Sequence, residues 1–259
     1  MSEPLRVEHD GSVTRVILTR AAAFNALNMD MVMALEENFV TLAADNGVRA
    51  IVLGGEGKAF CSGGDLKWVL AYAQGPAAAF HQLAARFHIA ITEIRRMAKP
   101  VIAALNGVAA GGGFSLALAC DFRVMAESAL LRQAYTSSGL SIDGGGTFTL
   151  PRMVGLARAL EIAAFDKPIS SEQALAWGLA TRIVKDGSAL AEATAMAHDL
   201  AAASLHSFGL SKGLLNDSFS SPLEAQLQRE REALSACGAH ADGREGLKAF
   251  TEKRKPAFT

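Results

Sequence analysis

The stretch KPVIAALNGVAAGGGFSLALACD, residues 99–121, decides the fold of the whole chain. Its apolar run at 101–105 predicts a buried strand, and Asn106-Gly107 predicts a turn. Three glycines, Gly111 to Gly113, then open a second apolar run that predicts a helix. Because glycines carry no side chain, the first N–H groups of that helix are uncovered at the positive end of its dipole. The stretch therefore predicts a place that holds negative charge.

Two other interpretations of this stretch stay open at this point. Residues 101–120 are nearly uncharged and have the length of a membrane span, although each glycine inside a helix costs about 1 kcal/mol relative to alanine. The glycines would also permit close packing of the helix against its neighbours. We favour the anion site because glycine-bearing loops recur elsewhere in the chain.

The composition allows one large domain, or one domain with a small appendage. Of the 259 residues, 50% are hydrophobic and 20% are charged, and 25 lysines and arginines balance 26 aspartates and glutamates. This balance gives no support to nucleic acid or an anionic membrane as a partner. An anion site must therefore be local.

The cysteines and the first residues bear on location and metal binding. Cys61, Cys120 and Cys237 are odd in number and lack the spacing of metal ligands, so we expect no metal site and a reducing cytoplasm. The opening residues MSEPLRVEHD are polar and lack the apolar core of a secretion signal. We therefore expect a cytoplasmic protein.

Strand and helix patterns alternate along the chain, as they do in an α/β fold. Short apolar runs predict strands at 12–19, 48–53, 121–125 and 129–133. Periodic apolar spacing predicts helices at 29–44, 76–96, 155–165, 170–177 and 190–203, with Asn28 and Ser170 as N-caps. The tail at 221–254 is charged and helical, and we expect it to pack on the body or on another subunit.

Two further glycine loops accompany the first. In GEGKAFCSGGDLKW, residues 55–68, Gly63 and Gly64 stand before Asp65, and a third set, residues 144–146, follows Asp143. Backbone N–H groups from the loops at Gly64 and Gly112 could converge on one oxygen. Such a pair stabilises an oxyanion that develops in a transition state, where losing one donor costs about 3–4 kcal/mol. We expect the oxyanion at this site to be that of an enolate or of a tetrahedral adduct of a thioester.

Three ordered motifs, KAFCSGGDL, KPVIAALNGVAAGGG and GLSIDGGGTFTLPRMVG, resemble those of the enoyl-CoA hydratase and isomerase family, the crotonases. The resemblance spans nearly the whole chain. It implies a crotonase fold, a spiral of ββα units, in a core at 1–200, with a helical trimerisation and cap region at 201–259. It also implies an acyl-CoA substrate, a homotrimer or a dimer of trimers, and no cofactor besides the coenzyme A of the substrate.

The same resemblance assigns site residues to positions of this chain. The oxyanion donors would be the backbone N–H groups of Gly64 and Gly112. Backbone contacts with the coenzyme A moiety would come from Ala23, Phe24, Ala26 and Ser62. Phe250 and Lys253 match tail positions that approach the coenzyme A of a neighbouring subunit. For the acyl pocket we expect a lining of Trp68, Leu70, Phe87, Tyr135 and Phe148.

The departures from the family pattern narrow the chemistry. A typical hydratase uses two glutamates, and their positions here match Ser115 and Tyr135. Without that pair, hydration loses acid–base assistance of roughly 10²–10⁴-fold. Asp143 remains, and isomerases that resemble the phenylacetate-pathway enzymes carry their acid–base carboxylate at this position. We therefore expect an enoyl-CoA isomerase with Asp143 as its single acid and base, and the first alternative is an enoyl-CoA hydratase with a different acid–base arrangement.

Several alternatives stay open. Asp143 could simply cap the following helix. In the 4-chlorobenzoyl-CoA dehalogenases an aspartate at this position attacks the aromatic ring with the help of a histidine, and His88 matches that histidine, so a dehalogenase or thioester hydrolase is a further candidate. Ser115 and Cys61 are weaker candidates for a nucleophile. An acyl-CoA-binding protein without catalysis is the candidate from a different class.

Overall fold

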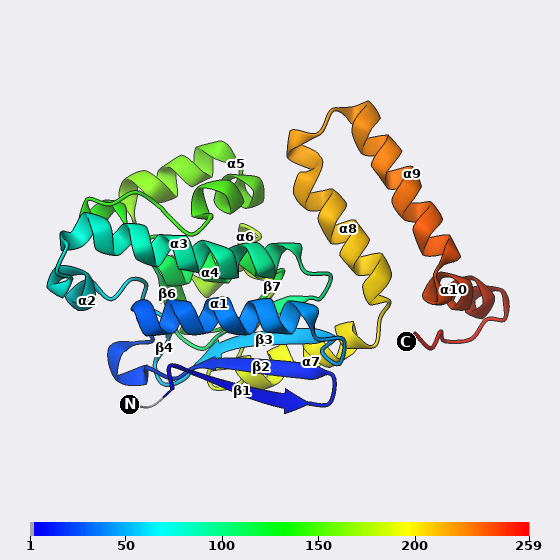
Figure 1. Cartoon of the computed structure of the whole chain (residues 1–259), viewed down its shortest axis with the longest axis horizontal. Coiled ribbons are helices and arrows are strands. Elements are labelled where there is room, and N and C mark those ends of the chain that lie inside the picture. The colour runs from blue at the N-terminus through cyan, green and yellow to red at the C-terminus, as the bar shows by residue number, and fades with distance from the viewer. Residues whose placement is uncertain (1–2, 259) are drawn as a thin grey trace.

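Two β-sheets form the centre of the molecule. The computed structural model describes residues 3–258 (Figure 1). The larger sheet has the order β1-β2-β3-β5-β7-β10, with the strands Leu5–Asp10, Val13–Leu18, Ala50–Gly55, Val101–Leu105, Phe122–Ala126 and Arg182–Val184. The smaller sheet has the order β4-β6-β8-β9, with the strands Ala59–Cys61, Val108–Ala110, Leu130–Arg132 and Ile169–Ser170.

One ββα unit repeats three times along the chain. The first strand of each unit, β3, β5 or β7, joins the larger sheet, and the second strand, β4, β6 or β8, joins the smaller one. Within each sheet these strands pair in parallel. The helices that complete the units are α2 (Leu66–Ala71) with α3 (Gly75–Arg96), α4 (Gly112–Ala119) and α5 (Gly146–Phe165). The expected α/β spiral of ββα units is confirmed.

Helices cover both faces of the larger sheet (Figure 1). On one face, α1 (Met29–Ala44) and α3 bury residues such as Leu35 and Phe39 against the sheet. On the other face, α7 (Ala189–Ala201) packs small side chains, among them Ala193 and Ala197, against the alternate residues of the same strands. Because successive strand residues point to opposite faces, one apolar strand serves both cores.

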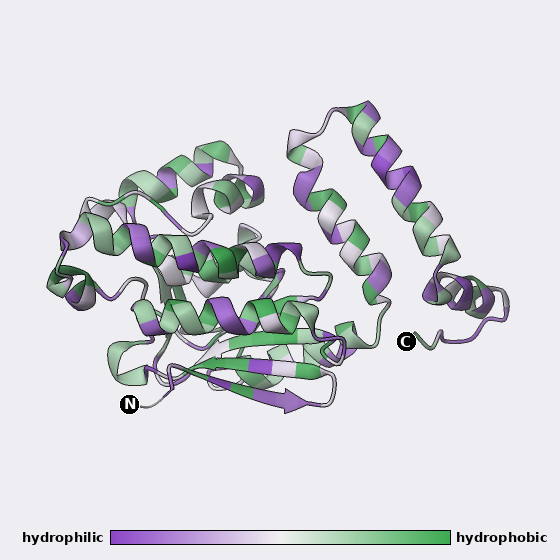
Figure 2. Cartoon of the chain, viewed as in Figure 1, coloured by the Kyte–Doolittle hydropathy of each residue, from purple (hydrophilic) through white to green (hydrophobic). Residues whose placement is uncertain are grey.

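The C-terminal helices stand beside this body as an arm (Figure 1). Its helices are α8 (Leu205–Asp217), α9 (Leu223–Ala239) and α10 (Ala241–Thr251). Lys212 of α8 is buried and donates to Asp121 at 2.8 Å and to the Ile94 carbonyl at 2.8 Å, which ties α8 to the body. Figure 2 shows that hydrophilic residues predominate along much of α9.

The predicted helix at 29–44 is confirmed with its cap, since the Asn28 side chain accepts from the Met31 N–H at 3.0 Å. Ser170 likewise caps α6 (Ser171–Ala176) in a capping box with Gln173. Other boundaries were wrong. The strands β1, β4, β6, β9 and β10 were not predicted, and the start of α5 was expected at residue 155. The strands β4, β6, β9 and β10 escaped prediction because two or three residues carry too little periodicity to be recognised, whereas β1 has six residues of mostly polar sequence.

The helix α5 begins at Gly146 and carries a kink at Gly155, where φ is +76°. The glycines that precede it open a helix in the same way as those at α4. The membrane interpretation of residues 101–120 is wrong, because this stretch folds as β5, β6 and the eight-residue helix α4. Within residues 3–258, no helix has the length and apolar character needed to cross a bilayer.

Candidate active site

A pocket of about 400 Å³ opens where the three parallel strands of the smaller sheet end. Ser62 and Gly64 follow β4, Gly111 and Gly112 follow β6, and Tyr135 follows β8, and all of them line the pocket. Ligand sites of α/β folds commonly lie at the carboxyl ends of parallel strands. The parallel register of the smaller sheet therefore brings residues from three distant loops to one place.

The glycine loops touch each other through their backbones. A Cβ on Gly63, where φ is +95°, would lie 2.9 Å from the Ala110 carbonyl oxygen, and a Cβ on Gly113 would lie 2.1 Å from that of Cys61. These two positions therefore require glycine. Their contact sets the oxyanion candidates Gly64 and Gly112 on the same side of the pocket.

The main-chain pairing around Gly64 leaves its N–H directed away from Leu27. Leu27 pairs with Gly64 as a parallel bridge, in which the Leu27 N–H donates to Gly63 and its carbonyl accepts from Asp65. The Gly64 N–H itself takes no part in that bridge. Gly112 is the first residue of α4, so its N–H has no partner within the helix. The N–H of Gly64 is therefore not used by the bridge, and that of Gly112 is not used within α4, while both residues line the pocket.

The expected coenzyme A loop is fixed to the same region. Arg20 donates to the Ala26 carbonyl and forms an ion pair with Asp65 at 2.9 Å. The buried Asn25 donates to the Ala59 carbonyl at 2.8 Å, while Phe24 is 56% exposed. Burial alone would raise the pKa of Asp65, but hydrogen bonds from Arg20 and the Trp68 N–H outweigh it and hold that pKa below its ordinary value.

Asp143 is the carboxylate of the pocket. Its Oδ1 lies 2.7 Å from His88 Nε2, and both side chains are about half exposed. The Ser115 hydroxyl donates to the Asp143 main-chain carbonyl at 2.6 Å. The Asp143 side chain therefore pairs with His88 rather than capping α5, and α5 has no side-chain cap at all.

Tyr135 lies between Ser115 and Asp143. Its hydroxyl is 3.4 Å from Ser115 Oγ, and a hydrogen bond from the Asp143 main chain reaches the same phenol oxygen. Burial raises the pKa of Tyr135 well above its ordinary value, and these hydrogen bonds offset only part of that rise. The phenol is therefore neutral at physiological pH.

Several expected contributors lie elsewhere. Of the five residues expected to line the acyl pocket, only Phe87 and Tyr135 do so. Leu70 is 76% exposed, and Trp68 packs against Tyr72 with ring centroids 4.9 Å apart. Phe148 lies under Arg152, whose guanidinium carbon is 3.5 Å from the ring centroid.

Phe250 lies in the last turn of α10, and Lys253 follows the end of that helix. The helix α10 lies far from the N-terminal half of α3 and hence from the pocket (Figure 1). The structure does not bring them to the pocket of their own chain. Ala23 and Ala26 lie in the loop before Leu27 and do not line the pocket, whereas Ser62 does.

Cys61 is fully buried, and burial raises its pKa to about 12, so its thiol is neither exposed nor ionised. Ser115 is also fully buried, with its hydroxyl engaged by Asp143. Neither side chain has the access that a nucleophile needs. Within residues 3–258, no group of three or more histidine, cysteine or acidic side chains is arranged to hold a metal ion.

The helix α3 contributes an apolar wall of the pocket, of which only Phe87 was expected. Phe80, Leu83, Ala84 and Phe87 line the pocket at helical spacing, together with His81. Their i, i+3, i+4, i+7 spacing marks one face of a helix, which was the available signal. The spacing does not say which neighbour this face contacts, and only the tertiary structure shows that it faces the glycine loops.

Comparison with known proteins places this pocket in a family. The family model for enoyl-CoA hydratase/isomerase matches residues 8–259. The chain belongs to the enoyl-CoA hydratase/isomerase family. A crystal structure of an enoyl-CoA hydratase from Polaromonas sp. JS666 superposes with a TM-score of 0.94 at 35% identity, covering 98% of this chain and 99% of that one.

Members of the enoyl-CoA hydratase/isomerase family with different names resemble this chain. It is 38% identical over 250 residues to 1,2-epoxyphenylacetyl-CoA isomerase of Escherichia coli (strain K12), with 95% of each chain covered. It is 33% identical over 253 residues to 4-chlorobenzoyl coenzyme A dehalogenase-2 of Arthrobacter sp, covering 96% of this chain and 91% of that one. Family membership therefore leaves the reaction to be argued from the residues.

Proposed function

We propose that this chain is an enoyl-CoA isomerase that shifts a double bond through a thioester enolate. The observation that carries the proposal is the position of Asp143 in the pocket of Gly64 and Gly112. Among the described residues that line this pocket, Asp143 alone carries a carboxylate. One carboxylate is what a double-bond shift needs.

In the proposed reaction, Asp143 removes a proton from C2 of a 3-enoyl thioester. The electrons move to the thioester oxygen, and the resulting dienolate is held by the N–H groups of Gly64 and Gly112. The protonated Asp143 then returns the proton to C4, which leaves the 2-enoyl product. His88 accepts or donates at Asp143 Oδ1 and keeps the carboxylate turned toward the pocket. The reaction uses no cofactor besides the coenzyme A of the substrate.

Hydration ranks below isomerisation for a physical reason. Syn addition of water calls for an acid and a base, and Ser115 and Tyr135 stand where the family pattern has two glutamates. The Ser115 hydroxyl is already donated to the Asp143 carbonyl, and the Tyr135 phenol stays neutral. Neither group can remove a proton from water at neutral pH.

The test follows 3-enoyl-CoA and 2-enoyl-CoA of medium chain length in deuterated water, with NMR and mass spectrometry as readouts. Formation of the conjugated 2-enoyl ester, with no water added across its double bond, supports the isomerase. Formation of a 3-hydroxyacyl-CoA would instead support the hydratase. If neither ester reacts, two candidates remain. The substrate would contain a ring, or the protein would bind acyl-CoA without catalysis.

The 2.7 Å contact between His88 and Asp143 favours a second candidate, a dehalogenase or hydrolase. In that reaction Asp143 attacks an aryl-CoA ring and displaces halide, or attacks a thioester and displaces coenzyme A thiolate. His88 then activates the water that hydrolyses the resulting ester or anhydride of Asp143. A single turnover in ¹⁸O-labelled water distinguishes the two candidates. Label in the peptide that contains Asp143 supports the nucleophile, whereas an isomerase leaves that peptide unlabelled.

We also propose that the chain forms a homotrimer or a dimer of trimers in the cytoplasm, with a core at 1–200 and a trimerisation and cap region at 201–259. Exposed apolar side chains on the arm support this, among them Leu215, Phe219, Leu223, Leu227, Leu234, Leu247 and Phe250. Such residues are expected to be covered by another surface. Light scattering after size-exclusion chromatography measures the state, and a monomer would contradict the proposal.

A further inference from the structure

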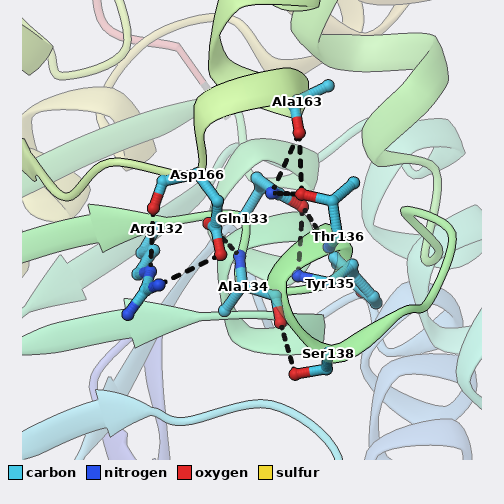
Figure 3. A network of polar contacts seen from close by, with 8 residues as sticks. All are labelled: Arg132, Gln133, Ala134, Tyr135, Thr136, Ser138, Ala163 and Asp166. Carbon is cyan, nitrogen blue, oxygen red and sulfur yellow. Dashed lines mark hydrogen bonds and ion pairs between the residues drawn. The ribbon is translucent and has the colours of Figure 1, made fainter.

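A buried polar network holds the segment that follows β8 (Figure 3). Asp166 is 5% exposed and lies directly after α5. Its Oδ1 accepts from the Ala134 N–H at 2.7 Å, and its Oδ2 pairs with Arg132 at 3.1 Å. Arg132 also donates to the Asp166 main-chain carbonyl at 3.0 Å. The carboxylate thus joins the end of α5 to the first residues after β8.

A buried carboxamide, that of Gln133, holds the same turn (Figure 3). Gln133 is fully buried, and its Oε1 accepts from the N–H groups of Tyr135 at 3.0 Å and Thr136 at 3.3 Å. The Thr136 hydroxyl donates to the Ala163 carbonyl of α5 at 2.7 Å. The segment is therefore tied to α5 at several points before the chain enters the pocket.

This network maintains a left-handed residue that is not glycine. Ala134 has φ +52°, a conformation that costs an L-residue roughly 1–2 kcal/mol. The hydrogen bond from its own N–H to Asp166 accompanies that conformation. The reversal at Ala134 turns the chain so that Tyr135 lines the pocket beside Asp143. Strain of this kind persists where the surroundings fix it.

We propose that Asp166 is a positioning residue of the active site, which holds Ala134 in its left-handed conformation and so keeps Tyr135 against Ser115 and the Asp143 main chain. Asp143 lies before α5 and Asp166 follows it. The acid–base candidate and the proposed positioning residue therefore flank the two ends of one helix. Asp166 does not itself line the pocket, but it binds the N–H of Ala134, which does. The part of this proposal that concerns turnover rests on the proposed isomerase; the part that concerns Tyr135 does not.

The chain offers a direct probe, because it holds only two tyrosines, Tyr72 and Tyr135. In a Tyr72→Phe background, the absorbance of ionised phenol reports on Tyr135 alone. An ordinary phenol with a pKa of about 10 is roughly three-quarters ionised at pH 10.5. Burial raises the pKa of Tyr135, so in this background we expect it to stay largely neutral at that pH.

Asp166→Ala in this background is expected to release Tyr135 and increase its ionised fraction at pH 10.5 at least threefold. Asp166→Asn, which keeps an oxygen for the Ala134 N–H, should give an intermediate value and covers the case in which Asp166→Ala fails to fold. Asp186→Ala is the matched control. Asp186 also accepts a main-chain N–H, that of Ser128 at 2.9 Å, but at the opposite end of β8.

Rescue separates positioning from general support of the fold. Ala134→Gly removes the steric cost of the left-handed conformation, so Asp166→Ala with Ala134→Gly should recover at least half of the lost Tyr135 protection. A folded Asp166→Ala variant with an unchanged phenol overturns the proposal, and so does a loss that Ala134→Gly leaves unrecovered. We expect kcat for isomerisation to fall about tenfold and recover in parallel. If the parent protein isomerises nothing, the proposed function fails while the phenol readout still decides the role of Asp166.

Discussion

The Ser115 hydroxyl donates a hydrogen bond to the main-chain carbonyl of Asp143 at 2.6 Å. The loop after Asp143 lies so close to Ser115 that a Cβ on Gly146 would come within 2.8 Å of Ser115 Oγ. A small side chain at 115 and an inward Asp143 loop therefore depend on each other. A glutamate at 115 would need the volume that the loop fills.

Ser115→Glu is expected to displace the Asp143 loop and lower the free energy of unfolding by about 1–3 kcal/mol, as overpacking does. It should also abolish isomerisation without creating a hydratase. Ser115→Ala adds no volume and loses the hydroxyl that contacts the Asp143 carbonyl and Tyr135, at about 1–2 kcal/mol. Urea unfolding and activity assays measure both variants, with Ser128→Glu in an exposed turn as the control. An active, stable Ser115→Glu enzyme would show that the loop has other room.

Asp143→Asn tests the acid–base role. The amide cannot accept a proton from C2, so kcat should fall by roughly 10²–10⁴-fold. Because the amide occupies the same volume, calorimetry should give a dissociation constant for a saturated acyl-CoA within about threefold of the parent. A tenfold change would correspond to about 1.4 kcal/mol of binding free energy. Asp199→Asn, on the exposed face of α7, is the control. Unchanged turnover in Asp143→Asn would remove Asp143 from the mechanism.

Two glycine variants compare a position in tight backbone contact with a position that has free space around it. A Cβ on Gly113 would lie 2.1 Å from the Cys61 carbonyl oxygen, whereas a Cβ on Gly64 meets nothing within 4 Å. We expect Gly113→Ala to lower the free energy of unfolding by about 3 kcal/mol or more, because the backbone of β4 cannot move freely. Gly64→Ala should leave stability within about 0.5 kcal/mol. Thermal and urea unfolding compare the two, and equal losses would refute the packing argument.

Asp65 makes stability depend on pH in the acid range. Its pKa lies below the ordinary value because hydrogen bonds from Arg20 and the Trp68 N–H outweigh its burial. A lowered pKa contributes stability above the unfolded value, near 3.9, that is lost as the pH falls through the folded value. The parent should therefore exceed Asp65→Asn in unfolding free energy at pH 6, and the difference should shrink toward pH 3. A constant difference across this range would mean that the charge of Asp65 contributes nothing.

The helix boundaries that were predicted correctly from the sequence depend on signals within a few residues of each boundary. The cap at Asn28 and the helical period behind it fixed both ends of α1, because both signals act within a few residues. The glycines before α4 marked a helix start for the same reason. The three motifs at 58–66, 99–113 and 139–155 also identified the family, which the comparisons confirm.

The sequence by itself determined the alternation of strands and helices, the glycine loops and the family. Only the tertiary structure decided which loops meet. The parallel register of β4, β6 and β8, of which only β8 was predicted from the sequence, brings Gly64, Gly112 and Tyr135 to one pocket. Contacts such as His88 with Asp143 and Asp166 with Ala134 join residues 55 and 32 positions apart. No local pattern encodes such a pair, because its geometry follows from the packing of whole elements rather than from neighbouring side chains.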